Sequence, residues 1–398
     1  MRFYDIAIVG AGASGLAAGL TAGRAGARVL FLERMPRVGK KILATGNGRC
    51  NLGNRNALEH PYHNSEFATP ALDKFGGCES FFDSLGLAVR EDEEGRLYPR
   101  SNMAASVLDA LRFGAERAGC ELRCDCPVTS IESSKDGFHI NNSIAARRVI
   151  IAAGGCAAPA QGSNGSGFSL LRSLGHSVVE PRPALVQIKA YSPLLPMLKG
   201  LRVHAGIRIE RDSKVLRRAE GEILFAQDGL SGIAAMEVSR DAQKGSTAVL
   251  DLLPEYSIEE LAGLLSKWRE ACPAHSDVQL LAGLTPKRVA EAVVKSTQNT
   301  PRPCGPPPSK EGGLAHSCKN FTFKIIGTRG FEHAQVTAGG AEVSQFDPRT
   351  MESRVMPGLF ACGEALDVDG GCGGFNLHWA WVSGVLAGLC AASQAKPR

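Results

Sequence analysis

Two kinds of hydrophobic pattern follow one another along this chain. Near the N-terminus two short, mostly apolar runs, Tyr4–Val9 and Val29–Leu32, flank a helical pattern over Ser14–Arg24. Apolar runs without polar alternation are typical of parallel strands that are buried on both faces. The pattern therefore predicts a strand–helix–strand unit at the start of an α/β fold.

A different pattern begins near residue 184. Short runs there alternate between apolar and polar positions, as in Val203–Ile209, which predicts strands with one buried face. Helical patterns follow from Ser257 and from Thr285, where Pro286 suits the first helical position. A strand pattern at Phe321–Ile326 then leads back to a glycine-rich C-terminal part. We therefore expect a discontinuous α/β domain that is interrupted by a β-rich and helical insert.

Composition places the chain among folded globular proteins, because 44% of its 398 residues are hydrophobic and 21% are charged. The net charge is +5, and the sequence contains no run of five basic residues, which argues against a dedicated nucleic-acid arm. The 12 cysteines are scattered without metal-ligand spacing, so we expect reduced thiols and no bound metal. No signal-peptide pattern and no stretch of ~20 uninterrupted apolar residues occurs, so we expect a cytoplasmic protein without a membrane span.

A glycine pattern lies between the first predicted strand and helix. Gly10, Gly12 and Gly15 form GxGxxG there. In this setting the glycines allow a tight turn, a close approach of phosphates to the backbone, and close packing of helix on sheet. Glu33 ends the second strand and would bind ribose hydroxyls; a glycine-rich turn with a chance acidic residue is the alternative. The dinucleotide contacts predicted at this end are Gly10, Gly12, Ala13, Ser14, Gly15, Glu33 and Arg34.

The C-terminal part bears on which dinucleotide is bound. Gly358–Gly363 predicts a strand that runs into a turn, where Glu364 could bind the ribitol chain of FAD. Gly373 and Gly374 then open a helix, whose N-terminus carries about half a positive charge and would stabilise an anionic reduced flavin. A simple helix cap is the alternative, but the pattern favours FAD over NAD. The contacts predicted at this end are Gly363, Glu364, Gly374, Phe375, Asn376 and Leu377.

Residues 36–60 are rich in Gly, Asn, Arg and Lys and predict a long polar loop. We expect this loop to wrap the cofactor, with its lysines and Arg49 near phosphate; a solvated basic loop is the alternative. The further cofactor contacts predicted in this loop and elsewhere in the same domain are Lys41, Gly48, Arg49, Cys50, Asn51, Val128, Ala153, Gly154 and Gly155.

Five segments together resemble one known family. They lie at residues 39–51, 95–99, 336–340, 350–353 and 367–381, and the first and last are the most specific, reading GKKILATGNGRCN and DVDGGCGGFNLHWAW. On these motifs the chain is similar to the YhiN/BaiN-like flavoproteins over essentially its whole length. Two sites depart from the family pattern: Ala226-Gln227 stands where many members carry Thr-His, and His378 stands where Gln is common.

The resemblance implies a fold and a set of reactions. The fold is α/β, with a discontinuous Rossmann-type FAD domain over 1–188 and 334–398, a β-barrel-like subdomain over 189–254 and 320–333, and a helical subdomain over 255–319. The reactions associated with the family are reduction of conjugated double bonds in steroid-like acids, oxidation of aminoacetone, and reduction of a ribosomal RNA uridine to dihydrouridine. The resemblance therefore fixes the cofactor more firmly than the substrate.

Two residues are candidates for catalytic proton transfer. Cys50 lies beside Arg49, which would lower the pKa of its thiol. His378 ordinarily titrates near neutral pH and lies one turn into the C-terminal helix. A structural cysteine and a packed histidine are the alternatives. Trp379 and Trp381 are two positions apart on that helix, so at most one can line a substrate pocket.

Other charged residues have two interpretations each. Asp367 and Asp369 either bind a polar substrate group or shape a turn. Six basic residues of the insert either form a patch for RNA or lie on a solvated face, which strand alternation favours. These six are Arg202, Arg208, Arg211, Lys214, Arg217 and Arg218.

The sequence thus predicts an FAD-dependent oxidoreductase that transfers hydride through flavin N5 to or from a small organic substrate. There is no second GxGxxG, so NAD(P)H, if it supplies the electrons, would bind transiently beside the flavin. An enzyme that reduces a ribosomal RNA uridine is the second hypothesis, and a flavin-binding sensor without turnover is the third. The sequence leaves the oligomeric state open.

Overall fold

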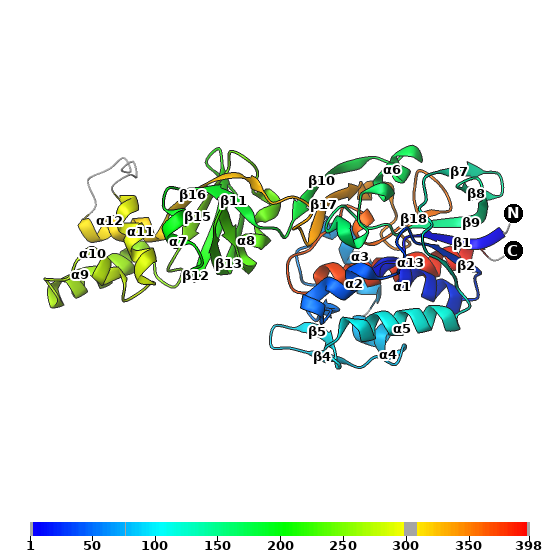
Figure 1. Ribbon diagram of the computed structural model, residues 1–398, viewed down its shortest axis with the longest axis horizontal. Helices are drawn as coiled ribbons and strands as arrows, with labels where there is room; N and C mark the ends of the chain where they lie inside the picture. The colour runs from blue at the N-terminus through cyan, green and yellow to red at the C-terminus, as the bar shows by residue number, and fades with distance from the viewer. Residues whose placement is uncertain (1–2, 76, 298–308, 396–398) are drawn as a thin grey trace. The chain divides into compact units, whose positions relative to one another are not determined.

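The computed structural model describes residues 3–75, 77–297 and 309–395. Its contacts divide the chain into two compact units. Residues 1–183 and 335–398 form the first, which we call the Rossmann unit, and residues 184–334 form the second, the barrel unit. Figure 1 shows the chain passing out of the Rossmann unit after β10 and returning to it at β17.

The Rossmann unit is built on a seven-stranded sheet with the order β6-β2-β1-β9-β8-β7, in which β18 also pairs with β9. Strands β6, β2, β1, β9 and β18 are parallel, whereas β8 and β7 run antiparallel to their neighbours. The strands are β1 (Phe3–Val9), β2 (Val29–Leu32), β6 (Glu121–Arg123), β7 (Ile131–Ser134), β8 (Gly137–Ile140), β9 (Ile144–Ile151) and β18 (Leu359–Ala361). The buried apolar runs predicted at the N-terminus are β1 and β2, and the α/β fold class is confirmed.

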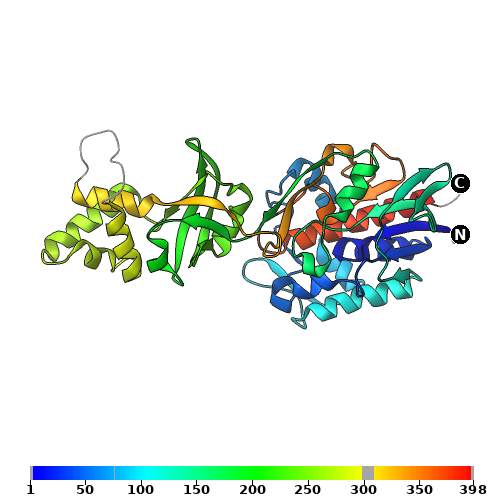
Figure 2. The same ribbon diagram turned by 45° about the horizontal axis from the view of Figure 1, so that its top comes forward.

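Two helices from opposite ends of the chain pack together in this unit. Helix α1 (Ala13–Arg24) contacts α13 (Phe375–Ala395) along much of its length, and α5 (Ala104–Arg117) packs against α1. Glycines permit the close contact, because a Cβ added at Gly384 would lie 2.4 Å from the carbonyl oxygen of Ser14. In Figures 1 and 2, β1 begins and α13 ends on the same side of the unit. Both ends of the chain therefore contribute to one unit.

Helix α13 is long and apolar enough, by length and composition alone, to cross a membrane. However, 61% of its most apolar window is buried inside the structure. Trp379 and Trp381 are both buried, and the helix also contacts β1 and β9. This burial is typical of the core helix of a folded domain.

The remaining elements of the Rossmann unit form smaller layers. The sequence predicts one long loop over residues 36–60, but the structure has α2, a 3-10 turn and β3 in this stretch. Two helices, α3 and α4, follow in the chain. These elements are α2 (Lys40–Ala44), η1 (Thr45–Gly48), the antiparallel sheet of β3 (Gly53–Asn54), β5 (Arg96–Pro99) and β4 (Val89–Glu91), α3 (Ser65–Phe75), α4 (Cys78–Asp83), η2 (Pro159–Gln161), α6 (Ser166–Ser173), the pair β10 (Val178–Ala184) and β17 (Val336–Ala341), η4 (Val343–Gln345) and η5 (Gly363–Ala365).

The barrel unit contains a closed barrel with the strand order β11-β14-β13-β12-β15-β16. Alternate residues of β12, namely Ala205, Ile207 and Ile209, are buried, as the alternating pattern predicts. Strand β13 is longer than its apolar run, because its first five residues are exposed in a hairpin with β12. The strands are β11 (Ile188–Tyr191), β12 (Arg202–Arg211), β13 (Lys214–Ala226), β14 (Gly229–Ser231), β15 (Thr247–Asp251) and β16 (Phe321–Thr328).

Helices complete the barrel unit and share its hydrophobic core. Ser257 caps α9 with a capping box that includes Glu260, and α11 begins just after Pro286, so both predicted helix starts are confirmed. The helices are α7 (Leu195–Leu198), α8 (Ile233–Glu237), η3 (Ser239–Asp241), α9 (Ile258–Ala271), α10 (Asp277–Leu281), α11 (Lys287–Thr297) and α12 (Lys310–Lys319).

Candidate functional site

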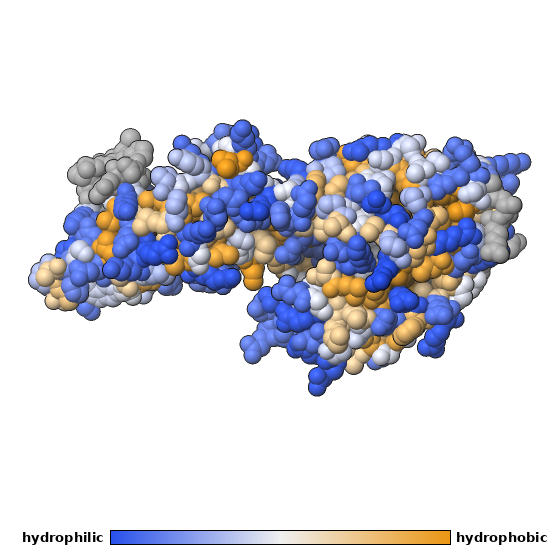
Figure 3. Space-filling model, in the orientation of Figure 1, coloured by the Kyte–Doolittle hydropathy of each residue, from blue (hydrophilic) through white to orange (hydrophobic). Residues whose placement is uncertain are grey.

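A cavity of about 330 Å³ lies in the Rossmann unit where β1 ends and α1 begins. Both ends of the chain line it, since α1 and α13 contribute residues to its wall. Apolar residues gather over much of the viewed face of this unit in Figure 3. The predicted cofactor contacts that line the cavity are Gly10, Gly12, Ala13, Ser14, Glu33, Arg34, Lys41, Val128, Ala153, Gly154, Glu364, Asn376 and Leu377.

The three glycines of GxGxxG have different surroundings. Gly10 has a φ of +100°, and a Cβ added there would lie 2.5 Å from the carbonyl oxygen of Ala152. A Cβ at Gly15 would lie 2.1 Å from the carbonyl oxygen of Gly10. At Gly12, by contrast, no atom of the described residues beyond its chain neighbours lies within 4 Å of an added Cβ. The outer glycines therefore serve the packing of the turn, whereas the middle one borders open space at the N-terminus of α1, which suits a bound phosphate.

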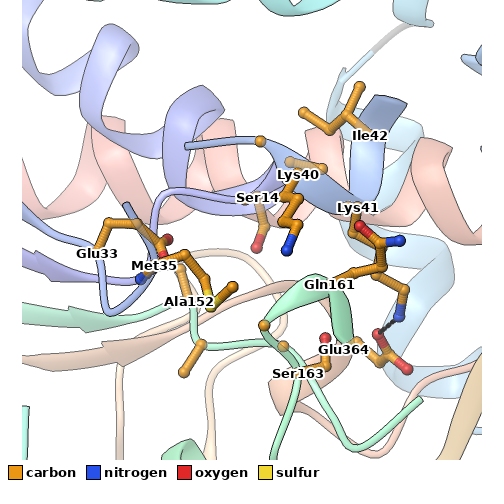
Figure 4. Close-up of a pocket in the computed structure, with 18 of the residues that line it drawn as sticks. Ser14, Glu33, Met35, Lys40, Lys41, Ile42, Ala152, Gln161, Ser163 and Glu364 are labelled. Atoms are coloured by element: carbon orange, nitrogen blue, oxygen red, sulfur yellow. Dashed lines mark hydrogen bonds and ion pairs between the residues drawn. The ribbon is translucent and has the colours of Figure 1, made fainter. Parts of the chain in front are cut away.

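Glu33 closes the turn from the end of β2. The residue is 9% exposed, and its two carboxylate oxygens accept hydrogen bonds of 2.8 Å each from the backbone N–H groups of Ala11 and Met35. Figure 4 shows this side chain at one end of the cavity. Since each carboxylate oxygen has a second lone pair, Glu33 can also accept from the hydroxyls of a ribose.

An ion pair marks another part of the cavity wall. Lys41 Nζ lies 2.9 Å from Oε2 of Glu364, and both side chains are partly exposed to the cavity (Figure 4). Oε1 of Glu364 accepts a hydrogen bond of 2.6 Å from the backbone N–H of Thr337. Gly155 lies behind this carboxylate, because a Cβ added there would be 3.0 Å from Oε1. The loop 39–51 and the C-terminal turn thus meet at one charged pair.

Cys50 has neither the exposure nor the low pKa that we expect of a proton donor. The residue is fully buried, and burial raises the pKa of its thiol to about 11, although a hydrogen bond with the Thr45 side chain opposes the rise. The predicted lowering of this pKa is therefore wrong. Arg49 does not act on the thiol as expected, because its guanidinium stacks over the ring of Tyr98 at 5.1 Å. Burial in an apolar environment disfavours the thiolate, so Cys50 is a packing residue.

His378 also lies away from the cavity wall. It is 5% exposed, and its Nδ1 lies 3.5 Å from the backbone N–H of Asn54, which donates to it. Burial lowers the pKa of this imidazole to about 4, so the expectation that it titrates near neutral pH is wrong. The neighbouring Trp379 lines the cavity and donates from Nε1 to the carbonyl oxygen of Gly363, whereas Trp381 is fully buried and donates to Leu52.

The other predicted contacts do not line the cavity, and some of them pack against residues near it. Gly374 has a φ of +96°, and a Cβ there would lie 2.4 Å from Oδ1 of Asn51. That oxygen is buried and has no hydrogen-bond partner in the described part of the chain. Gly363 donates its N–H to Oγ of Ser383 on α13. The predicted residues outside the cavity wall are Gly15, Gly48, Arg49, Cys50, Asn51, Gly155, Gly363, Gly374 and Phe375, together with His378.

Sequence reasoning missed several lining residues that come from loops without a motif. They lie after β6 and after β9, and they reach the cavity only because these strands lie in the same parallel sheet as β1. The predicted GxGxxG contains no signal for them. The missed polar residues of these loops are Thr129, Gln161, Ser163, Asn164 and Ser166.

Comparison with known proteins places the chain in a family. The model of the HI0933-like protein Rossmann domain matches residues 4–390. The chain belongs to the HI0933-like family. This membership confirms the resemblance to YhiN/BaiN-like flavoproteins and makes the protein an oxidoreductase, whereas it leaves the substrate open.

Two curated relatives cover nearly the whole chain. A 3-dehydro-bile acid delta(4,6)-reductase of Clostridium scindens is 38% identical over 98% of this chain and 99% of its own length. A ribosomal RNA dihydrouridine synthase of Escherichia coli is 31% identical over 96% of each chain. Among solved structures, a 3-ketosteroid delta1-dehydrogenase from Sterolibacterium denitrificans aligns with a TM-score of 0.54 at 11% identity, covering 99% of this chain and 100% of that chain. At this identity the structural likeness shows the fold alone.

The residues present fit FAD. The N-terminus of α1 and the open space at Gly12 suit a pyrophosphate, and Glu33 suits a ribose. Apolar Val368, Leu377 and Trp379 also line the cavity and give its wall a surface for a planar ring system. One continuous cavity therefore offers polar groups at the positions that a dinucleotide needs.

Proposed function

We propose that this oxidoreductase holds FAD in the cavity of the Rossmann unit and reduces a conjugated carbon–carbon double bond in a small organic substrate. When bound, FAD supplies hydride transfer through its N5 atom. The observation that carries the proposal is the cavity itself, which Gly12, Glu33 and the Lys41–Glu364 pair all line.

The chain's own residues have separate tasks in this proposal. The backbone N–H groups at the start of α1 bind the phosphates, and Glu33 binds the adenosine ribose. Lys41 and Glu364 bind the polar chain between the phosphates and the ring. Trp379 and Leu377 exclude water from the ring, which strengthens electrostatic interactions there.

The choice of substrate rests on the relative from Clostridium scindens, whose name describes a bile acid reductase, and on the charges of the barrel unit. Four of the basic residues that might have bound RNA are paired with acidic side chains. These pairs are Arg202–Glu222, Arg208–Glu210, Arg211–Asp212 and Arg217–Asp241. Paired guanidinium groups are poorer ligands for phosphate, so these ion pairs favour a solvated surface over an RNA-binding patch.

We also propose that NAD(P)H supplies the electrons by transient binding beside the flavin, and that the reaction takes place in the cytoplasm. The free state of every cysteine in the described part of the chain is in keeping with a reducing compartment.

Anaerobic stopped-flow spectroscopy tests this proposal. NADPH should bleach the flavin absorption of the purified holoprotein, and an enone such as 2-cyclohexen-1-one or a 3-oxo-Δ4 bile acid should restore it. Bleaching by NADPH with no recovery on any enone would reject the proposed substrate class. No bleaching, together with recovery of the dithionite-reduced protein by enones, would reject only the electron donor.

Reduction of a ribosomal RNA uridine is the second candidate, because relatives from Escherichia coli and Haemophilus influenzae, 31% and 26% identical, are named ribosomal RNA dihydrouridine synthases. Mass spectrometry of ribosomal RNA from a deletion strain tests it. Loss of a dihydrouridine in that strain would support this candidate, and unchanged dihydrouridine would reject it.

A further inference from the structure

The loop between β9 and α6 forms part of the cavity wall in the Rossmann unit. It closes on itself, because the Gly165 N–H donates to the carbonyl oxygen of Gly155 at 3.0 Å. Three consecutive residues of this loop, Gln161, Gly162 and Ser163, line the cavity. The loop therefore presents polar side chains to a molecule that binds there.

Two cationic side chains from the chain that follows β2 hold this loop. Arg34 Nη1 donates to the carbonyl oxygen of Gly162 at 3.1 Å, and Lys40 Nζ donates to the carbonyl oxygen of Ala160 at 2.9 Å. Gly162 also packs against Met35, since a Cβ added at this glycine would lie 3.0 Å from Cγ of Met35. These contacts tie the loop to the chain after β2, so its side chains have a defined position at the cavity.

The hydroxyl group of Ser163 lies in the cavity wall without a partner from the protein. The residue is 7% exposed, and its Oγ forms no hydrogen bond with any residue that the structure describes. Leaving a buried hydroxyl unpaired is unfavourable, and most buried polar groups have a hydrogen-bond partner. Because Ser163 lines the cavity, a molecule bound in the cavity can supply that partner.

Two consecutive glycines show which part of the cavity the hydroxyl borders. A Cβ added at Gly154 would lie 3.4 Å from Oγ of Ser163, and a Cβ added at Gly155 would lie 3.0 Å from Oε1 of Glu364. The hydroxyl and this carboxylate thus border the same short piece of backbone, and Figure 4 shows both residues on one side of the cavity. Glu364 is a group to which we assign the polar chain of FAD, so Ser163 lies near the same part of the cofactor.

We propose that the Ser163 hydroxyl binds FAD through a hydrogen bond to an oxygen of its ribitol–pyrophosphate chain. The inference rests on the proposed function, which places FAD in this cavity. A hydroxyl donates to a phosphate oxygen, and it can donate to or accept from a ribitol hydroxyl. Since Ser163 gives up no hydrogen bond to the protein when it binds the cofactor, the new bond adds to FAD affinity.

The test compares FAD affinity with apoprotein stability in the full-length protein. Purified apoprotein is titrated with FAD by flavin fluorescence, and its urea midpoint is measured separately. In Ser163→Ala we expect the Kd for FAD to rise on the order of 3- to 10-fold, as for the loss of one hydrogen bond. The urea midpoint of the apoprotein should stay the same or rise, because the substitution removes a buried group that has no partner in the protein.

Ser239→Ala is the matched control, because Ser239 is a buried serine whose hydroxyl is paired. It lies in the barrel unit and is 1% exposed, and its Oγ donates to the carbonyl oxygen of Met236 at 2.6 Å and accepts from the N–H of Val186 at 3.2 Å. We expect this substitution to lower the urea midpoint of the apoprotein and to leave the Kd for FAD unchanged. The two serines should therefore give opposite patterns.

The possible outcomes are distinct. If the wild type does not bind FAD, the proposed function fails, and the inference fails with it. If the wild type binds FAD and Ser163→Ala binds it equally tightly, the role of Ser163 is refuted while the proposed function stands. A fall of the urea midpoint in Ser163→Ala as large as that in Ser239→Ala also refutes this role, because the hydroxyl would then serve the fold.

Discussion

Two glycine turns, one near each end of the chain, both precede a helix of the Rossmann unit, yet they are built for different neighbours. At the N-terminal turn, a Cβ added at Gly12 would meet no other described residue within 4 Å. At the C-terminal turn, Gly374 is covered by Asn51 and Gly53, whose atoms lie 2.4 Å from an added Cβ. The first turn therefore leaves its helix N-terminus open to a ligand, whereas the second holds a loop of the protein itself. A glycine motif before a helix does not by itself indicate which of the two it serves.

The largest effect we expect is a difference in stability between the two turns when their glycines are exchanged for alanine. Gly374→Ala should destabilise the apoprotein by about 3 kcal/mol or more, because it combines a positive φ with two backbone or side-chain clashes. Gly12→Ala should change the stability of the apoprotein by less than about 0.5 kcal/mol, since its Cβ meets nothing. Urea denaturation of the apoproteins measures both.

The same pair should differ in the other direction in cofactor binding. Gly12→Ala should weaken FAD binding about tenfold or more, because its Cβ occupies the space where the phosphates approach the backbone. Fluorescence titration of apoprotein with FAD gives the affinity. Equal stability losses in both variants, with FAD affinity unchanged in Gly12→Ala, would remove the distinction between the turns.

Glu33→Ala sharpens the account of the open turn. The backbone N–H groups of Ala11 and Met35 would lose their acceptor, and leaving a buried donor such as that of Ala11 unpaired costs about 1–3 kcal/mol. We expect the urea midpoint of the apoprotein to fall and FAD affinity to fall as well. Glu33→Gln is the control, since its side-chain oxygen keeps one of the two bonds. A loss of FAD affinity with no loss of stability would show that the carboxylate contacts only the ligand.

The histidine under the covered turn makes stability depend on pH. His378 has a pKa of about 4 in the fold against an ordinary value of 6.5, so at acidic pH the unfolded chain binds a proton that the folded chain does not. The contribution of His378 to stability should therefore be fully present above pH 6.5. As pH falls from 6.5 towards 4, the free energy of unfolding should decrease by on the order of 1 kcal/mol per pH unit. In His378→Gln the slope of unfolding free energy against pH between 6 and 4.5 should be shallower. An unchanged slope would contradict the buried neutral state.

The ion pair between the two ends should matter least for stability. The side chains of Lys41 and Glu364 are 28% and 20% exposed, and pairs with this access to solvent contribute at most about 1 kcal/mol. Lys41→Met should accordingly leave the thermal midpoint nearly unchanged while lowering FAD affinity. A drop of the midpoint as large as that in Glu33→Ala would show that the pair holds the two ends together.

The fold class and the GxGxxG turn were predictable from the sequence because both are recorded in local patterns. Strands β1 and β2 are short apolar runs, and Gly10, Gly12 and Gly15 have fixed spacing. The exposed half of β13 was not predictable, since its residues face solvent and carry no apolar alternation. The helix in residues 36–60 was missed because only five residues form it.

The candidate site was predictable only where a residue follows a motif. Arg49 precedes Cys50 in the chain, yet its guanidinium turns to Tyr98, so adjacency in sequence did not predict the pKa of the thiol. His63 pairs with the buried carboxylate of Asp367, which lies 304 positions away in the chain, and no local pattern connects the two residues. Burial and long-range pairing, which decide the titration of a side chain, are properties of the folded chain.

Titration of the purified apoprotein with FAD, with NAD as the competitor, tests the central claim most directly. The account predicts a yellow, stoichiometric FAD complex that NAD does not displace and that forms at least about tenfold more weakly in Gly12→Ala. A protein that binds only NAD, or neither nucleotide, would contradict it.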